Sequence, residues 1–184
     1  MRTVLVLFMT SLLAFADTPW VTSVSPSPRA DGPYTAGGLF QMGATSYYLT
    51  SIGRLCLTGD SGNHTLYIVN AADSILLTAT VNMAGCQANT YVYTTACLHL
   101  TARTSYYILS TETGGAEPWS DGTSGTVTTS AATLNIGAFS TSVPYSGGPI
   151  SSSNGYAMFV GLNFTYARGC GGSGAVLNGL PVVY

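Results

Sequence analysis

Hydrophobic and polar residues alternate through the middle of the chain, and short turn-like segments separate the alternating runs. In one run, Leu55 and Leu57 share a face while Arg54 and Cys56 share the opposite face, which is the period of two typical of a half-buried strand. The segments in between are rich in Gly, Asp, Asn and Ser, which supply positive φ or bond their own backbone in turns. The pattern therefore predicts a β-meander over residues 54–82 with its leucines facing the core.

Strand patterns continue on both sides of this meander. The cleanest is residues 156–166, where apolar side chains occupy every second position, so this strand is expected to close the core. Its inward residues are Tyr156, Met158, Val160, Leu162, Phe164 and Tyr166. Further strands are predicted at residues 20–24, 38–42, 47–50, 90–96, 98–100, 105–110 and 126–139. Many short strands without a helical period predict an all-β, antiparallel β-sandwich, most simply a jelly roll, in a single domain over residues 17–167.

The first residues have the pattern of a secretory signal peptide. The positive start Met1-Arg2 is followed by an apolar run over residues 4–15, and Ala14-Phe15-Ala16 satisfies the small-residue rule for cleavage. An apolar run of about 12 residues is shorter than the roughly 20 that a membrane-spanning helix needs. We therefore expect residues 1–16 to be removed, no membrane span, and a secreted, extracellular protein.

Residues 168–184 form a separate C-terminal segment, in which a glycine-rich hinge, RGCGGSG, precedes a short apolar tail strand, AVLNGLPVVY. An unpaired strand satisfies its backbone by joining the edge of a sheet. Two outcomes are open: the tail strand folds back onto its own sandwich, or it is added to the sheet of a neighbouring subunit. In the second case, the residues expected at the contact are Leu180, Val182, Val183 and Tyr184.

Charged residues make up only 7% of the chain, with seven acids, five arginines and no lysine. Soluble domains usually contain about a quarter. A surface with so little charge stays soluble through attached glycans, or is buried in an assembly. Five scattered arginines cannot form the basic stripe that a phosphate backbone requires, so nucleic acid is excluded as a partner.

Four cysteines, Cys56, Cys86, Cys97 and Cys170, lack the spacing of a metal site and are expected to form disulfides in an oxidising compartment. Cys86 and Cys97 are separated by an extended run that rises about 3.3 Å per residue, so their pairing is unfavourable. Cys56 and Cys97 both point away from the leucine face of their strands. The pattern favours Cys56 with Cys97 and Cys86 with Cys170, with an interchain bond by Cys170 as the alternative.

Two sequons, Asn63-His64-Thr65 and Asn163-Phe164-Thr165, are candidate N-glycosylation sites. Asn63 lies in a predicted turn, and Asn163 lies on the face opposite the apolar residues of its strand. Both side chains are therefore expected to be exposed. The alternative is that the two sequons are chance matches in a chain rich in Asn and Thr.

No catalytic arrangement is predicted. A Ser or Cys nucleophile needs a His base that a carboxylate orients, but His64 lies beside a turn, His99 faces outward on a strand, and no serine occupies a G-x-S-x-G motif. The acids of residues 111–124 could supply the carboxylate pair of a glycosidase, yet a solvated or calcium-binding loop is the simpler interpretation. The protein is therefore expected to be non-enzymatic.

Four segments in order resemble a known type of module: PRADGPYTAGGLFQMG, LTSIGRLCLTGDSGNHTLYIVNAADSILLTATVNMAG, LTARTSYYILSTETGGAEPWSD and YAMFVGLNFTY. They are similar to the DUF4082 domains and the galactose-binding-like sandwiches of large secreted bacterial proteins, where such jelly-roll modules accompany carbohydrate-active or adhesive domains. The resemblance covers residues 20–166. We expect the chain to act as a single module, and this expectation, its four cysteines and its tail strand distinguish it from the resembling domains and favour assembly or adhesion over substrate targeting.

The acidic loop over residues 111–124 is the best ligand candidate. The resemblance implies that Trp119, flanked by Glu117 and Asp121, stacks on a sugar; the alternative is that Trp119 caps the end of the sandwich. Loop carboxylates suit Ca²⁺, so Glu112, Glu117 and Asp121 are the candidate ligands of a structural calcium ion, and no other cofactor is expected.

Two functions follow as hypotheses. The first is a secreted structural or adhesive module that self-associates into an extracellular surface, matrix or fibre. The second is a carbohydrate-binding module that recognises cell-surface glycans through the Trp119 loop.

Overall fold

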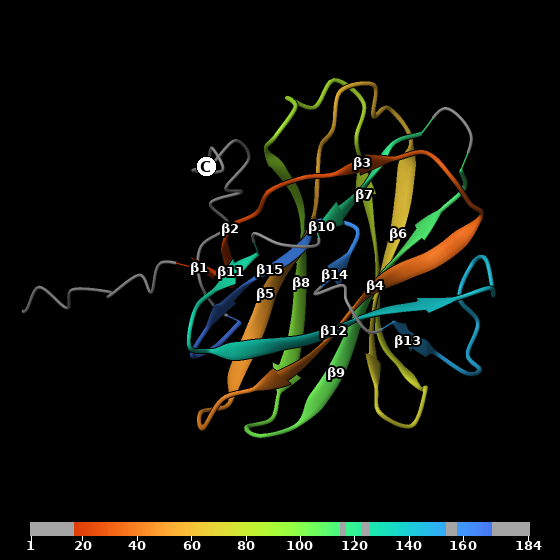
Figure 1. Ribbon diagram of the computed structural model, residues 1–184. Coiled ribbons are helices and arrows are strands. Elements are labelled where there is room, and N and C mark those ends of the chain that lie inside the picture. Colours follow the sequence, from red (N-terminus) through yellow and green to blue (C-terminus); the bar gives the residue numbers. More distant parts are fainter. Residues whose placement is uncertain (1–16, 115–116, 123–125, 154–157, 171–184) are drawn as a thin grey trace, which may run out of the picture.

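The computed structural model describes residues 17–114, 117–122, 126–153 and 158–170 (Figure 1). Within these ranges the chain forms fifteen β-strands and no helix, and hence no helix able to cross a membrane. The strands are β1 (Thr18–Pro19), β2 (Val21–Ser23), β3 (Pro28–Arg29), β4 (Tyr34–Met42), β5 (Tyr47–Leu55), β6 (Asn63–Asn70), β7 (Ile75–Asn82), β8 (Tyr91–Leu100), β9 (Ser105–Glu112), β10 (Trp119–Gly122), β11 (Val127–Thr128), β12 (Ala132–Ser140), β13 (Ser151–Ser153), β14 (Met158–Phe159) and β15 (Leu162–Ala167).

Two main sheets form the sandwich (Figure 1). One has six strands in the order β13-β12-β4-β9-β6-β7, and the other has four in the order β1-β15-β5-β8. Two small sheets, β14-β10-β3 and β11-β2, complete the fold. All strand pairs are antiparallel. The all-β antiparallel sandwich expected from the sequence is thereby confirmed.

Aromatic residues occupy the centre of the core between the main sheets. The ring centroids of Trp20 and Phe164 are 4.8 Å apart, and those of Phe40 and Phe164 are 5.3 Å apart. All three side chains are fully buried. The indole Nε1 of Trp20 donates a hydrogen bond of 2.9 Å to the carbonyl of Ala132, which satisfies its one polar group. Strands from both sheets are thus joined around one packed centre.

The single strand expected over residues 156–166 is wrong. The described part of this segment holds two short strands, and β14 pairs with β10 while β15 pairs with β5. Between them Val160 has a φ of 57°, a left-handed conformation that is rare for a β-branched residue and differs from the extended backbone of a strand. A Cβ on Gly161 would lie 2.7 Å from the Cβ of Leu55. The chain changes sheets at this point, and the close approach to Leu55 requires a glycine.

The strict alternation expected around Leu55 also fails. Leu55 and Leu57 are buried as predicted, but Arg54 and Cys56, expected to face outward, are buried as well. The loop before β10 covers Arg54, because the carbonyl of Pro118 accepts a hydrogen bond of 2.8 Å from its guanidinium. A second loop covers Cys56. The outer face of β5 is therefore closed by chain segments that lie far away in the sequence.

The preferred disulfide pairing is wrong as well. The structure joins Cys56 to Cys86 and Cys97 to Cys170, with Cα atoms 6.1 and 5.7 Å apart. Two backbone hydrogen bonds hold the loop that carries Cys86 against the end of β5, from the amide of Cys56 to the carbonyl of Thr90 and from the amide of Asn89 to the carbonyl of Cys56. Cys97 is exposed on β8, which leaves it accessible to the segment that follows β15.

Candidate functional site

Five ionisable side chains gather at one end of the sandwich. They come from the end of β5, the following turn, the start of β6, the last residue of β9, and the loop before β10. We call them the charge cluster: Arg54, Asp60, His64, Glu112 and Glu117. Because β6 pairs with β9 in the six-stranded sheet, the ends of these distant segments meet.

Arg54 is the centre of the charge cluster and is fully buried. Its guanidinium binds Glu112 through two hydrogen bonds, Nε to Oε1 at 3.1 Å and Nη2 to Oε2 at 2.9 Å. Its Nη1 binds Oδ2 of Asp60 at 2.6 Å. A buried charge is tolerated only when it is paired and hydrogen-bonded in this way. Burial opposes ionisation of Glu112, but the hydrogen bond with His64 and the charge of Arg54 outweigh it and lower the pKa of Glu112.

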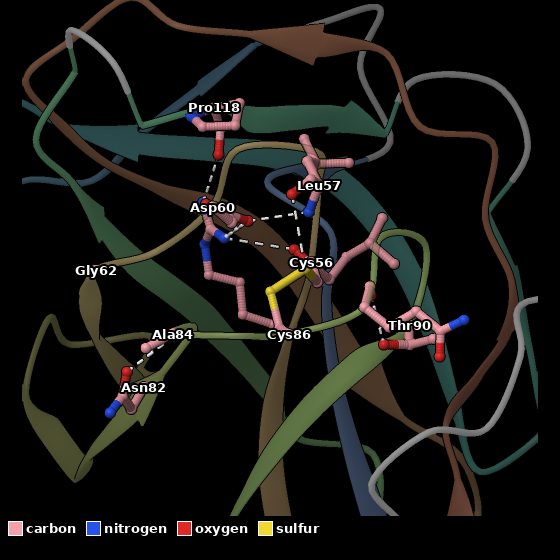
Figure 2. The surroundings of a disulfide bond; sticks show 12 residues. Cys56, Leu57, Asp60, Gly62, Asn82, Ala84, Cys86, Thr90 and Pro118 are labelled. Carbon is pink, nitrogen blue, oxygen red and sulfur yellow. Dashed lines mark hydrogen bonds and ion pairs between the residues drawn. A yellow bond between two sulfur atoms is a disulfide. The ribbon is translucent and has the colours of Figure 1, made fainter.

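The turn after β5 fixes Asp60. The backbone amide of Leu57 donates a hydrogen bond of 3.0 Å to Oδ2 of Asp60, and the Asp60 amide returns one of 3.1 Å to the Leu57 carbonyl. Figure 2 shows Asp60 and Pro118 in the surroundings of the Cys56–Cys86 disulfide, with the hydrogen bond from the Leu57 amide to Asp60 drawn as a dashed line. The side chain of Asp60 is fully buried, and its second oxygen, Oδ1, has no hydrogen-bond partner among the described residues.

His64 lies between two sets of acceptors. Its Nδ1 is 3.2 Å from the carbonyl of Thr111 and 3.4 Å from Oε2 of Glu112. Its Nε2 is 3.4 Å from Oε2 of Glu117 and 3.9 Å from Oδ1 of Asp60. Burial lowers the pKa of His64, but the hydrogen bond with Glu112, the charge of Glu112 and the hydrogen bond with the Thr111 carbonyl together outweigh burial, and the net shift is upward.

Glu117 forms the outer wall of the charge cluster. Its side chain is 23% exposed, whereas those of Asp60 and His64 are 0% and 3% exposed. Ser61 donates a hydrogen bond of 3.0 Å to Oε1, and the backbone amide of Gly62 donates one of 3.4 Å to Oε2. One ligand atom each of Asp60, His64 and Glu117 lies within 4.8 Å of the other two, so these three residues could together hold a metal ion.

Trp119 does not have the exposed position that stacking on a sugar requires. It is 2% exposed, its Nε1 donates a hydrogen bond of 2.8 Å to the carbonyl of Asp31, and the guanidinium of Arg29 lies 4.7 Å over its ring. The structure therefore supports the alternative, a tryptophan that caps the sandwich. Its ring does line a cavity of about 170 Å³ together with Tyr34 and Phe159.

The expected calcium set of Glu112, Glu117 and Asp121 is also wrong. Glu112 is bound to Arg54, and Asp121 pairs with Arg29 at 3.0 Å. Of the three expected ligands, only Glu117 belongs to the group of Asp60, His64 and Glu117 whose ligand atoms lie close together. Sequence reasoning missed Arg54, Asp60 and His64, although ionisable residues are so scarce in this chain that three of them within eleven positions were a usable signal.

The two sequons differ in position. Asn63 is exposed at the start of β6, so its glycosylation stays a prediction. Asn163 is fully buried, and its amide donates hydrogen bonds of 2.9 Å to the carbonyl of Val21 and the hydroxyl of Tyr93. The expected exposure of Asn163 is wrong, because Val21 of β2 and Tyr93 of β8 cover this side chain. The proposed assembly residues Leu180, Val182, Val183 and Tyr184 lie outside the described residues, as do residues 1–16.

Neither family models nor curated proteins give a match to this chain. The resemblance to DUF4082 domains and galactose-binding-like sandwiches therefore stays a prediction.

Proposed function

We propose that this protein is a non-enzymatic, secreted structural module that self-associates through the outer strands of its sandwich. The observation that carries the proposal is the contrast between the edges of the two main sheets. At one edge lie β1 and β13, of two and three residues; at the other lie β7 and β8, of eight and ten residues. Neither β7 nor β8 contains a charged residue of the Lys, Arg, Asp or Glu type, or a proline.

Long outer strands without charge or proline offer free backbone groups to a strand of another chain, and soluble proteins usually protect such edges. No described strand pairs with the outer sides of β7 and β8. Ile75 and Leu76, at the start of β7, are 39% and 40% exposed. These features support pairing between copies through this side of the molecule.

The burial of charges adds to this argument. Arg54, Asp60, Glu112 and Asp121 are all at least nine-tenths buried, which removes four of the few charges of the chain from its surface. Repulsion between like-charged copies is correspondingly weak. Weak repulsion between copies favours self-association.

The tail strand fits the same proposal. The disulfide to Cys97 fixes Cys170, which precedes the tail strand in the sequence, on the exposed face of β8, a long outer strand. The proposed contact of Leu180 and Val182 is with an outer strand of a second copy. The two disulfides and the leader-like residues 1–16 support secretion.

Light scattering and negative-stain imaging of the protein from a secreting host test the proposal. We expect concentration-dependent oligomers or fibres, which Thr78→Lys on exposed β7 disrupts and which a stop codon after Cys170 weakens. The matched control is Thr133→Lys, at an exposed position of β12, which pairs with β4 and β13 and is expected to leave assembly intact. A wild-type protein that stays monomeric at all concentrations would refute self-association.

Glycan recognition is the second candidate, and one observation favours it. The cavity beside Trp119 is also lined by Tyr34, Phe139, Phe159 and the charged Arg29, a combination of aromatic and polar groups that suits a sugar. A glycan array with wild type and Tyr34→Ala tests it. Absence of binding by the wild-type protein removes this candidate.

A further inference from the structure

The charge cluster is not balanced by its own residues. Asp60, Glu112 and Glu117 supply three negative charges and Arg54 supplies one positive charge, which leaves two negative charges when His64 is neutral. Arg54 contacts Oδ2 of Asp60 and both oxygens of Glu112, but none of its hydrogen bonds to the described residues reaches Oδ1 of Asp60 or Glu117. The excess negative charge is thus concentrated on the side of His64 that faces Asp60 and Glu117.

The acceptors around His64 determine which of its nitrogens is available to a ligand. The Thr111 carbonyl, 3.2 Å from Nδ1, can only accept a hydrogen bond, so Nδ1 carries the proton. Nε2 faces carboxylate oxygens of Glu117 and Asp60, which accept its hydrogen when His64 is charged, and its lone pair is available to a metal ion when His64 is neutral. A histidine that donates from one nitrogen to a carbonyl and a carboxylate, and offers the other, has the arrangement seen around metal-bound imidazoles.

We propose that Asp60 Oδ1, His64 Nε2 and Glu117 Oε2 bind a divalent transition-metal ion of the zinc type. The buried Oδ1 of Asp60, which has no hydrogen-bond partner among the described residues and lies 3.9 Å from Nε2, is the second observation that points to a ligand. A doubly charged ion would cancel the two excess negative charges. Glu112 and the Thr111 carbonyl then act on the metal through His64, by holding its ring and proton.

The donor set selects the metal. One imidazole nitrogen with two carboxylate oxygens suits zinc, whereas calcium takes six to eight oxygens. Zinc ligands at about 2.0 to 2.1 Å from the ion lie about 3.3 Å apart in a tetrahedron. The distance of 3.4 Å between His64 and Glu117 already fits, and the 3.9 Å between His64 and Asp60 closes by a small shift of Asp60. Partly exposed Glu117 provides the route from solvent and leaves the fourth position to water.

Calorimetric titration of the chelator-treated protein with ZnCl₂ tests the site. We expect one zinc ion per chain, and at least about tenfold weaker binding in Glu117→Gln, since even the loss of an outer partner of a metal ligand costs 10- to 100-fold. Two variants serve as matched controls and are expected to bind zinc like wild type. Asp73→Asn removes a carboxylate from another turn, and His99→Gln removes the exposed histidine of β8.

Nuclear magnetic resonance of the ¹⁵N-labelled imidazoles gives a second test on the unmodified protein. Zinc is expected to shift Nε2 of His64 and to leave Nδ1 protonated, with the His99 signals identified from His99→Gln. The proposal is overturned if wild type binds no zinc at micromolar concentrations, if Glu117→Gln binds as tightly as wild type, or if His64 signals do not move at saturation. Tighter binding of CaCl₂ than of ZnCl₂ would also overturn it.

Discussion

Replacing Glu112 with glutamine measures how strongly the fold depends on the buried ion pair with Arg54. Glutamine keeps the shape of the side chain and removes its charge, so no cavity complicates the result. Arg54 is fully buried and binds Glu112 at 3.1 and 2.9 Å, and after the substitution only Asp60, at 2.6 Å, offers it a carboxylate.

The expected loss of unfolding free energy is about 3 kcal/mol. Removing one partner of a buried ion pair typically costs about 3 to 5 kcal/mol, because the other charge stays buried, and the remaining contact with Asp60 favours the lower end of that range. In a domain of roughly 150 residues, this corresponds to a fall in Tm of roughly 6 to 12 °C.

Urea unfolding at pH 7, with disulfides intact and a chelator present, is the assay. The matched control is Glu117→Gln, whose side chain is 23% exposed and whose loss is expected to cost below about 1 kcal/mol. The double variant Arg54→Met, Glu112→Gln is expected to lose less than the sum of the single variants, since it leaves fewer unpaired charges. A loss below about 1 kcal/mol in Glu112→Gln would refute the reasoning.

The same pair predicts an acid dependence. The pKa of Glu112 is lowered from its ordinary value of 4.5, so its contribution to stability is present above that value and is lost as the pH falls through the folded pKa. The difference in stability between wild type and Glu112→Gln is therefore expected to shrink at pH values below about 4.5. A constant difference down to pH 2 would contradict this assignment.

Three further predictions concern other residues. Gly161→Ala is expected to lower the unfolding free energy by about 1 to 3 kcal/mol through the clash with Leu55, while Gly169→Ala, with open space around it, is expected to have little effect. In protein from a eukaryotic host, Asn163→Ala is expected to lower the Tm without changing the mass of attached glycan. Asn63→Gln, at the exposed sequon, is expected to remove attached glycan and to leave the Tm unchanged. Because the pKa of His64 is raised above 6.5, protonation of His64 stabilises the fold fully below pH 6.5, and this contribution is lost as the pH rises through the folded pKa. In the presence of a chelator, the Tm of the wild-type protein is therefore expected to fall above pH 6.5. His64→Gln is expected to make this fall smaller.

Local residue patterns identified most of the strands. The meander predicted over residues 54–82 contains β6 and β7, because turn residues bound these strands and alternation is a local property. The scarcity of acids in the sequence also drew attention to Glu112 and Glu117, and both belong to the charge cluster. Fold class, the positions of turns and the scarcity of charge were all readable from the chain itself.

The tertiary structure decided which faces are covered and which distant residues meet. Alternation alone cannot show that the loop before β10 closes over Arg54, or that residues of β2 and β8 cover Asn163. Disulfide partners depend on which loops lie beside which strands, so Cys56 pairs with Cys86 rather than with Cys97. Asp60, His64 and Glu117 converge only because β6 and β9 are neighbours, and such long-range pairing leaves no local trace in the sequence.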